Sequence, residues 1–220
     1  TMAELATAQQ FKEEGLFEYH LYTLQRPSTI KDNQTKQISL LATASVPVRK
    51  ELVMRSPQGW YGAPQGGEAG SKQKVGVFVE FDNRKANSLG MPLPKGTIRV
   101  YQQDKDNSVQ FVGEDSIDHT PEDEKVRVKV GDAFDVTGTR KQTDWKKLAS
   151  DTFEAGWEVV IRNHKQEDIT VKVLETLAGD WKIVESSVPL TKKDSQTAEF
   201  NVQVKKDDES RLTYRVKVRY

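Results

Sequence analysis

The sequence contains no cysteine, and this absence excludes a group of chemistries. A chain of 220 residues without thiols forms no disulfide, has no thiolate nucleophile and offers no cysteine ligand to zinc or to an iron–sulfur cluster. Long apolar runs are missing as well, and no stretch approaches the length of a membrane span. We therefore expect no membrane-spanning segment, and no signal peptide is visible in the chain.

An excess of charge of either sign is also lacking, because 33 Lys and Arg residues balance 33 Asp and Glu residues. A nucleic-acid surface needs a basic excess or a basic stripe to neutralise phosphates, so we expect no nucleic-acid partner. The same balance gives no reason to expect attraction to anionic lipid. Only 35% of the residues are hydrophobic, but they follow periodic patterns, which indicates a folded chain.

The motifs of several enzyme classes do not occur. There is no Gly-x-Ser-x-Gly, and the three histidines, His20, His119 and His164, stand in unrelated contexts, so serine-hydrolase chemistry has no support. Neither a Gly-x-Gly-x-x-Gly fingerprint nor a phosphate-binding loop is present, which argues against nucleotide binding. We expect no cofactor and no metal site.

Most of the chain alternates apolar and polar residues with a period of two, which predicts strands with one buried and one solvated face. The clearest examples are residues 17–23, 75–81, 126–130, 157–161 and 212–220. The polar face of the last strand carries Arg211, Arg215, Lys217 and Arg219, which we interpret as a solvated face balanced by nearby acids such as Asp207, Asp208 and Glu209. The predicted fold class is mainly β and antiparallel.

The predicted organisation has three parts. Residues 1–14 favour a short amphipathic helix, the end of a longer N-terminal region, since they contain strong helix formers and are followed by Gly15. Residues 15–135 are expected to form a β domain. Residues 136–220 are expected to form an immunoglobulin-like β-sandwich that opens with a polar linker at 136–151, because short strands and polar turns alternate there.

A Gly-rich loop at residues 56–73 is long for a connection within a sheet, and it carries Trp60 and Tyr61. Exposed aromatic side chains bind ligands at low entropic cost, so Trp60 and Tyr61 are candidates for a ligand-binding platform. The alternatives are that both fold back onto a neighbouring sheet or that the loop is disordered.

The acidic segment at residues 113–124 precedes an alternating strand and holds the best candidates for catalysis, namely Glu114, Asp115, Asp118 and His119. These side chains suit general acid–base chemistry or cation binding, but their spacing matches no known signature. The favoured interpretation is a polar turn that leads into a strand. Asp104, Asp106 and Asn107 raise the same choice between a calcium site and a hairpin turn, and the turn is favoured because the Gly and distal Glu of a calcium loop are missing.

Several stretches together resemble a bacterial family, the C-terminal domain of unknown function of mucoidy-inhibitor-like (MuiA-like) proteins. They are residues 19–22 with 33–38, the Leu-Gly-Met-Pro-Leu-Pro-Lys-Gly run at 89–96 leading to 99–101, the segments 113–115, 119–121 and 131–135, and finally 179–181 and 214–216. The resemblance covers nearly the whole chain after Gly15. It implies a periplasmic or otherwise extracytoplasmic protein with a larger N-terminal region, and it supplies no catalytic residues.

Three functions are consistent with these patterns. The leading hypothesis is a non-enzymatic binding or assembly module of the bacterial cell envelope, with an envelope protein or a polysaccharide as partner. The second is a glycan-acting hydrolase that uses carboxylates of residues 113–124, because two positioned carboxylates suffice for glycoside hydrolysis. The third is an architectural support for a larger N-terminal region.

Overall fold

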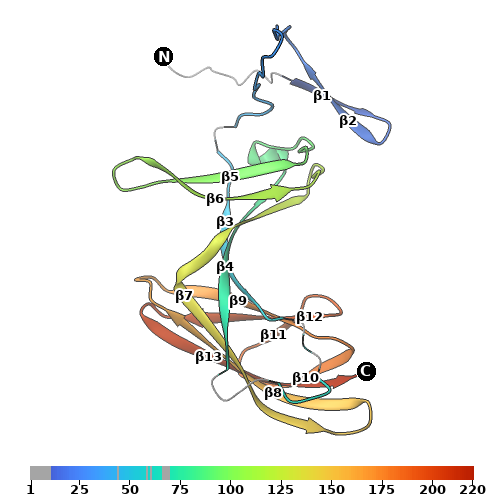
Figure 1. Ribbon diagram of the computed structural model, residues 1–220, viewed down its shortest axis with the longest axis vertical. Helices are drawn as coiled ribbons and strands as arrows, with labels where there is room; N and C mark the ends of the chain where they lie inside the picture. Colours follow the sequence, from blue (N-terminus) through green and yellow to red (C-terminus); the bar gives the residue numbers. More distant parts are fainter. Residues whose placement is uncertain (1–10, 44, 58, 60, 66–69) are drawn as a thin grey trace. The chain divides into compact units, whose positions relative to one another are not determined.

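The computed structural model describes residues 11–43, 45–57, 59, 61–65 and 70–220. These residues are mainly β, as predicted, and include no α-helix (Figure 1). The strands are β1 Phe11–Leu16, β2 Tyr19–Leu24, β3 Arg49–Arg55, β4 Ser71–Asp82, β5 Gly96–Gln103, β6 Val109–Ile117, β7 Lys125–Lys147, β8 Thr152–Asn163, β9 Ile169–Thr176, β10 Asp180–Ser186, β11 Leu190–Lys192, β12 Thr197–Val204 and β13 Asp208–Arg219. One 3₁₀ turn, η1, spans Lys85–Asn87.

The predicted N-terminal helix is wrong for residues 11–14, which belong to strand β1. Strands β1 and β2 form an antiparallel hairpin in which Phe11 lies opposite Leu24 and Leu16 lies opposite Tyr19. Helix propensity determines local structure only weakly. In residues 11–14, cross-strand pairing with β2 outweighs it. Residues 1–10 of the predicted helix lie outside the described residues.

Nine strands form one sheet in the order β10-β13-β8-β7-β4-β3-β9-β12-β11, and β5 with β6 forms a separate hairpin. The nine-stranded sheet is mixed, because β3 pairs with β9 in parallel whereas β8 pairs antiparallel with both β7 and β13. The hairpin of β5 and β6 confirms the predicted turn at residues 104–107, where the Asp104 N–H donates to the Ser108 carbonyl.

The predicted linker at 136–151 is wrong up to Lys147, because strand β7 continues through it. Val136, Gly138 and Arg140 are successive inward positions of β7. Gly138 allows a close approach, since a Cβ atom there would lie 2.7 Å from the Met54 sulfur. Because a glycine and an arginine occupy inward positions, the alternation of apolar and polar residues is not visible in the sequence. This is why a linker was predicted where the strand continues.

The chain divides into two compact units that interleave along the sequence. The first unit contains residues 1–49, 80–98 and 115–128, and the second contains residues 50–79, 99–114 and 129–220. Neither unit follows the predicted boundary between residues 135 and 136, because β3 and most of β4 belong with the C-terminal strands.

The core of the second unit lies between two facing parts of the nine-stranded sheet. Phe200 on β12 stacks on Tyr214 on β13 at a centroid distance of 5.4 Å, although these strands are not neighbours in the sheet. The sheet therefore folds back over an apolar interior that includes Trp157, Ile161 and Val173. An immunoglobulin-like sandwich would contain two separate sheets; that prediction is not confirmed, since hydrogen bonds connect all nine strands.

Candidate functional site

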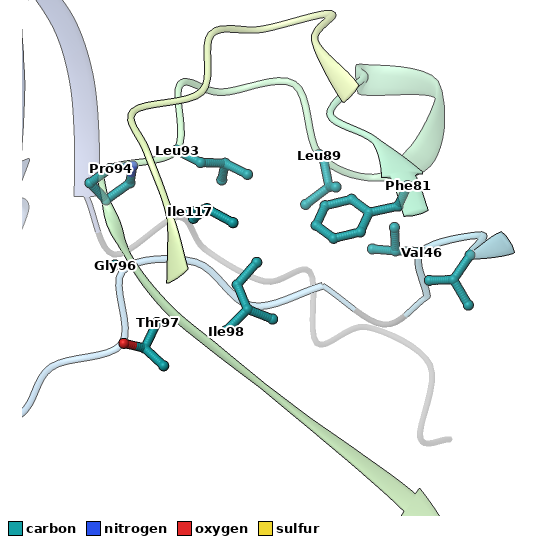
Figure 2. Close-up of a pocket in the computed structure, with 10 residues that line it drawn as sticks. Val46, Phe81, Leu89, Leu93, Pro94, Gly96, Thr97, Ile98 and Ile117 are labelled. Atoms are coloured by element: carbon teal, nitrogen blue, oxygen red, sulfur yellow. The ribbon is translucent and has the colours of Figure 1, made fainter. Parts of the chain in front are cut away.

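The first unit contains an open apolar pocket of about 360 Å³. Figure 2 shows side chains from several separate segments converging on this space. The lining residues are Val46, Val48, Phe81, Leu89, Leu93, Pro94, Gly96, Thr97, Ile98 and Ile117. Only Thr97 adds a polar side chain to this lining. Apolar side chains that gather in a folded protein ordinarily pack closely against one another. In the first unit they surround an open pocket instead.

The loop between η1 and β5 forms one wall of the pocket. Ser88 and Gly90 both adopt positive φ, 60° and 88°, which turns the chain sharply after η1. Gly90 is required at its position, because a Cβ atom there would lie 2.5 Å from the Lys85 backbone nitrogen. Leu89, within this turn, and Leu93, after it, both line the pocket (Figure 2).

Asn83 connects this loop to the segment that contributes Ile117 to the pocket. Its side chain is completely buried, and its Nδ2 donates to the carbonyls of Met91 and Pro121, both at 2.8 Å. Its Oδ1 accepts from the Gly90 N–H at 3.1 Å. A buried amide with all three contacts satisfied is costly to disturb, so Asn83 positions both walls.

The acidic segment at 113–124 supplies that second wall. Leu93 and Thr120 form an isolated antiparallel bridge with two backbone hydrogen bonds, of 2.8 and 2.9 Å. The bridge sets Ile117, from the same segment, beside Leu93 in the pocket. Residues 118–124 form the polar connection into β7 that the favoured interpretation predicted, but residues 113–117 belong to strand β6, so the turn is shorter than expected. The segment also frames the pocket, which the sequence did not indicate.

The four catalytic candidates of this segment occupy separate surface positions. Glu114 pairs with Arg99 at 2.9 Å, and Asp115 accepts a hydrogen bond from the Ser116 N–H. Asp118 lies 3.3 Å from Lys95 and is 90% exposed. His119 Nδ1 accepts a 3.3 Å hydrogen bond from the Lys95 backbone N–H, and none of the four lines the pocket.

Charged side chains stabilise the strands next to the pocket. Glu80 on β4 is nearly buried and contacts Arg49 at 3.2 Å and Lys125 at 3.1 Å. Burial alone would raise the pKa of the Glu80 carboxyl, but the hydrogen bonds from Lys125 and Arg49 outweigh burial and lower this pKa. The ionised carboxylate thus holds together β4, the start of β3 and the start of β7.

The hairpin of β1 and β2 is anchored to the pocket loop. The Tyr22 hydroxyl donates a 2.7 Å hydrogen bond to the Pro92 carbonyl. Partial burial, together with the negative charge of Glu13, raises the pKa of this phenol, so that it stays a donor at neutral pH. Tyr22 therefore connects the N-terminal hairpin to the wall that Leu93 belongs to.

Tyr61 is not an exposed platform, and the prediction of ligand binding by its side chain is wrong on that point. It is 1% exposed and packs edge-on against Trp157 at 6.1 Å between ring centroids. Its carbonyl accepts a 2.8 Å hydrogen bond from the Trp145 indole. Tyr61 thus folds back onto the sheet of the second unit, the alternative considered above. Trp60 lies outside the described residues.

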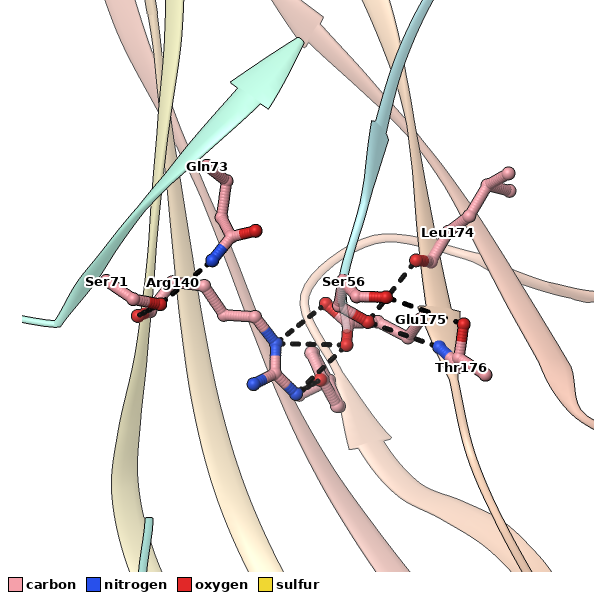
Figure 3. Close-up of polar contacts among 8 residues, drawn as sticks. Ser56, Ser71, Gln73, Arg140, Leu174, Glu175 and Thr176 are labelled. Atoms are coloured by element: carbon pink, nitrogen blue, oxygen red, sulfur yellow. Dashed lines mark hydrogen bonds and ion pairs between the residues drawn. The ribbon is translucent and has the colours of Figure 1, made fainter. Parts of the chain in front are cut away.

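A buried ion pair lies in the interior of the second unit (Figure 3). Arg140 on β7 contacts Glu175 on β9 at 3.0 Å, with exposed fractions of 6% and 0%. The guanidinium also donates to the Tyr214 hydroxyl and lies 3.3 Å from the Trp157 ring centroid. Burial opposes the charged form of Arg140. The contacts of the guanidinium with the Tyr214 hydroxyl oxygen and the Glu175 carboxylate outweigh this effect and raise the guanidinium pKa.

This ion pair is enclosed by other side chains, which assigns it a structural role. Burial, followed by the charge of Glu175, raises the pKa of the Tyr214 phenol, which therefore stays neutral. Ser56, directly after β3, lies beside the pair and connects to the end of β9. Its Oγ accepts a hydrogen bond from the Thr176 N–H at 3.2 Å (Figure 3). An enclosed pair of this kind orients strands β7 and β9 and offers no surface to a ligand.

The remaining candidates have local partners. The three arginines of the basic face of β13 form ion pairs: Arg211 with Glu158 and Glu209, Arg215 with Asp144 and Glu154, and Arg219 with Asp151. Of these acids, only Glu209 is among the expected residues 207–209. Asp104 accepts hydrogen bonds from the N–H groups of Asp106 and Ser108, as in a hairpin turn. Within the described ranges, no three His, Asp or Glu side chains group as metal ligands do.

Known proteins do not identify the chain. No model of a protein family matches it, and no curated protein matches it. In the part of the chain that the structure describes, no helix has the length and apolar character needed to cross a membrane. The resemblance to mucoidy-inhibitor-like proteins stays a prediction, and the pocket of the first unit is the feature from which a function can be argued.

Proposed function

We propose that this chain is a non-enzymatic binding module of the bacterial cell envelope, and that its pocket holds apolar side chains of a polypeptide partner. The observation that carries the proposal is the pocket itself, an open apolar space between two loops that Asn83 fixes in place. Preformed apolar pockets of roughly 300–1,000 Å³ are typical of binding sites. The location outside the cytoplasm rests on the family resemblance alone.

The chemistry of the lining favours apolar side chains over a sugar. A glycan presents hydroxyl groups around every ring, and each one needs a polar partner when water is removed. The lining offers the Thr97 hydroxyl and otherwise aliphatic or aromatic carbon, from residues such as Phe81 and Ile98. The pocket volume of about 360 Å³ lies near the lower end of the ligand range and suits one or two side chains.

The surroundings of the pocket favour binding over catalysis. Glu114, Asp115, Asp118 and His119 lie outside the lining and contact other surface groups. A hydrolase of the glycosidase type needs two carboxyl groups facing one another across the substrate. The side chains that line the pocket include no carboxyl group, so the proposal assigns it no reaction.

Calorimetry with a small apolar peptide tests the proposal. The probe is N-acetyl-Leu-Phe-amide, titrated into the full chain and into two variants. Leu93→Glu places a charge in the pocket, whereas Val109→Glu changes a residue of β6 that is 62% exposed and lies outside it. We expect saturable binding to the wild type and to Val109→Glu, and none to Leu93→Glu. Equal binding by all three proteins, or no binding by any, would refute the proposal.

A further inference from the structure

The tip of the β1–β2 hairpin is apolar, and the described residues leave much of its surface exposed. Leu16, Phe17, Tyr19 and Leu21 are 58%, 94%, 74% and 42% exposed. Leu16 and Tyr19 are directly opposite one another in the hairpin register, so both lie on one face. Contiguous exposed apolar side chains of this kind mark interaction sites more often than single ones do.

Phe17 is held in a conformation that its own contacts do not explain. It is the first residue of the two-residue turn between Leu16 and Tyr19, and its φ is 57°. Turns of this kind place glycine at such a position, because a side chain there is strained. The phenylalanine ring is almost fully exposed, so the strain gains nothing within the chain, and such strained residues concentrate at functional sites.

None of the tip residues Leu16, Phe17, Tyr19 and Leu21 lines the pocket. Tyr22, which pairs with Glu13 midway along the hairpin, donates its hydrogen bond to the Pro92 carbonyl of the pocket loop. The tip lies at the opposite end of the hairpin from the Phe11–Leu24 pair. The turn itself is exposed, because Phe17 is 94% exposed, and its ring is accessible to another molecule.

Exposed acidic residues flank the tip, and one lysine lies beside the pocket lining. Glu14 and Glu18 flank the apolar tip, and both are exposed. Lys95 lies between the lining residues Pro94 and Gly96, and its side chain is 66% exposed. Its contact with Asp118, which is 90% exposed, is a screened surface pair of little energy, so Lys95 can exchange partners.

These observations point to a second copy of this chain as the occupant of the pocket. We propose that the hairpin tip of one copy, with Phe17 at its end, inserts into the apolar pocket of another, while Glu18 approaches Lys95 of that copy. This inference rests on the proposed function, because it names the polypeptide whose side chains the pocket receives. The contact joins two different surfaces, so it is either reciprocal within a dimer or repeats from copy to copy.

Sedimentation of the full chain and its variants tests the proposal. Phe17→Gly removes the ring and suits the positive φ, so this variant keeps the turn; Leu93→Glu charges the pocket and repels the acidic tip. We expect mass above that of the monomer to grow with concentration for the wild type. We expect about tenfold or greater weakening of association in each variant, as for the loss of a central contact.

Mixing the two variants provides the sharper experiment. Phe17→Gly retains an intact pocket and Leu93→Glu retains an intact tip, so an equimolar mixture restores one tip-to-pocket contact and yields a heterodimer. The reversals Glu18→Lys and Lys95→Glu should each weaken association, and their combination should restore it. A wild type that is monomeric at every concentration, or a Phe17→Gly variant that associates as the wild type does, would overturn the proposal.

The outcomes separate this inference from the proposed function. A wild type that stays monomeric but binds N-acetyl-Leu-Phe-amide in the pocket retains the binding function and excludes the second copy as occupant. If the wild type binds no probe and also stays monomeric, both the proposed function and this inference are refuted. Association that persists in Leu93→Glu would place the contact elsewhere on the chain and contradict the inference directly.

Discussion

The buried side-chain amide of Asn83 donates a 2.8 Å hydrogen bond to the carbonyl of Met91, and through this contact strand β4 holds the pocket loop in place. The same nitrogen donates to the Pro121 carbonyl, in the segment that also contributes Ile117 to the pocket. One side chain thus determines the separation of two loops that are distant in sequence. A residue that does not line the pocket thus connects the segments that form it.

Replacement of Asn83 by alanine is expected to destabilise the first unit by about 2–3 kcal/mol, because the change leaves the buried Met91 carbonyl and the partly buried Pro121 carbonyl and Gly90 N–H without this partner. Asn87→Ala is the matched control: its Nδ2 makes one 3.1 Å hydrogen bond to the Asp82 carbonyl and its side chain is half-buried, so the expected loss is about 1 kcal/mol or less. Amide signals of Leu93 and Thr120, followed by NMR during urea unfolding, measure both values. Equal losses would show that Asn83 has no special role.

The buried pair of Arg140 and Glu175 predicts a large stability effect in the second unit. Glu175→Gln leaves a guanidinium without its counter-charge in a dry interior, and the expected loss is about 3–5 kcal/mol. Glu209→Gln is the control, because Glu209 and Arg162 form a pair at 3.1 Å with each side chain nearly half exposed. Removal of that exposed pair should cost less than about 1 kcal/mol. Tryptophan fluorescence during denaturant unfolding reports both.

Removing the charge of Arg140 together with that of Glu175 should recover part of the stability that Glu175→Gln loses. The double variant Arg140→Met with Glu175→Leu removes both charges together and replaces them with apolar side chains. We expect it to be more stable than Glu175→Gln alone. A double variant that is less stable than the single one would show that the pair contributes through hydrogen bonds to Tyr214 and packing on Trp157 more than through charge balance.

Glu80 predicts a defined pH dependence. Its folded-state pKa is lowered by Lys125 and Arg49 against the opposing effect of burial, so the folded state binds its proton less readily than the unfolded chain. The stabilisation is therefore complete above the unfolded value of about 4.3 and is lost as the pH falls through the folded value. Unfolding free energies measured from pH 7 to pH 3 should show a gap between wild type and Glu80→Gln that narrows toward acid. A gap that widens toward acid would contradict the assignment.

The positive φ of Phe17 predicts an unusual response to glycine. Phe17→Gly should leave the stability of the hairpin unchanged or raise it by up to about 1 kcal/mol, because glycine adopts this conformation without strain. Phe134→Gly is the control: Phe134 is equally exposed, at 94%, but lies within strand β7, where glycine should cost about 0.5–1 kcal/mol. Thermal unfolding of both variants gives the comparison, and equal losses would deny the strain at Phe17.

Strong alternation predicted the strands of this chain where the inward side chains are apolar. The strand at residues 157–161 and the last strand, with Leu212, Tyr214 and Val216 inward, are examples. The alternation does not reveal β7 beyond Val136, because its inward positions hold Gly138 and Arg140. The helix propensity of residues 11–14 was misleading for a related reason, since pairing with β2 determines their structure and no local signal reports it.

The pocket could not be predicted from the sequence, for a different reason. Its lining comes from separate segments that bring Val46, Phe81, Leu93, Ile98 and Ile117 together, and only the folded chain unites them. The organising residue is a single asparagine after a strand, in no motif. The acidic segment drew attention by its charges, whereas the structure uses its Ile117 side chain and its Thr120 and Pro121 backbone.

Methyl NMR of the full chain tests the central claim, that this pocket binds apolar side chains, most directly. Isoleucine δ1-methyl groups report from the pocket through Ile98 and Ile117 and from the second unit through Ile161 and Ile169. On titration with N-acetyl-Leu-Phe-amide, the account predicts saturable shifts at Ile98 and Ile117, none at Ile161 and Ile169, and no shifts in Leu93→Glu. Unchanged Ile98 and Ile117 signals at saturating probe, or equal shifts at all four residues, would contradict it.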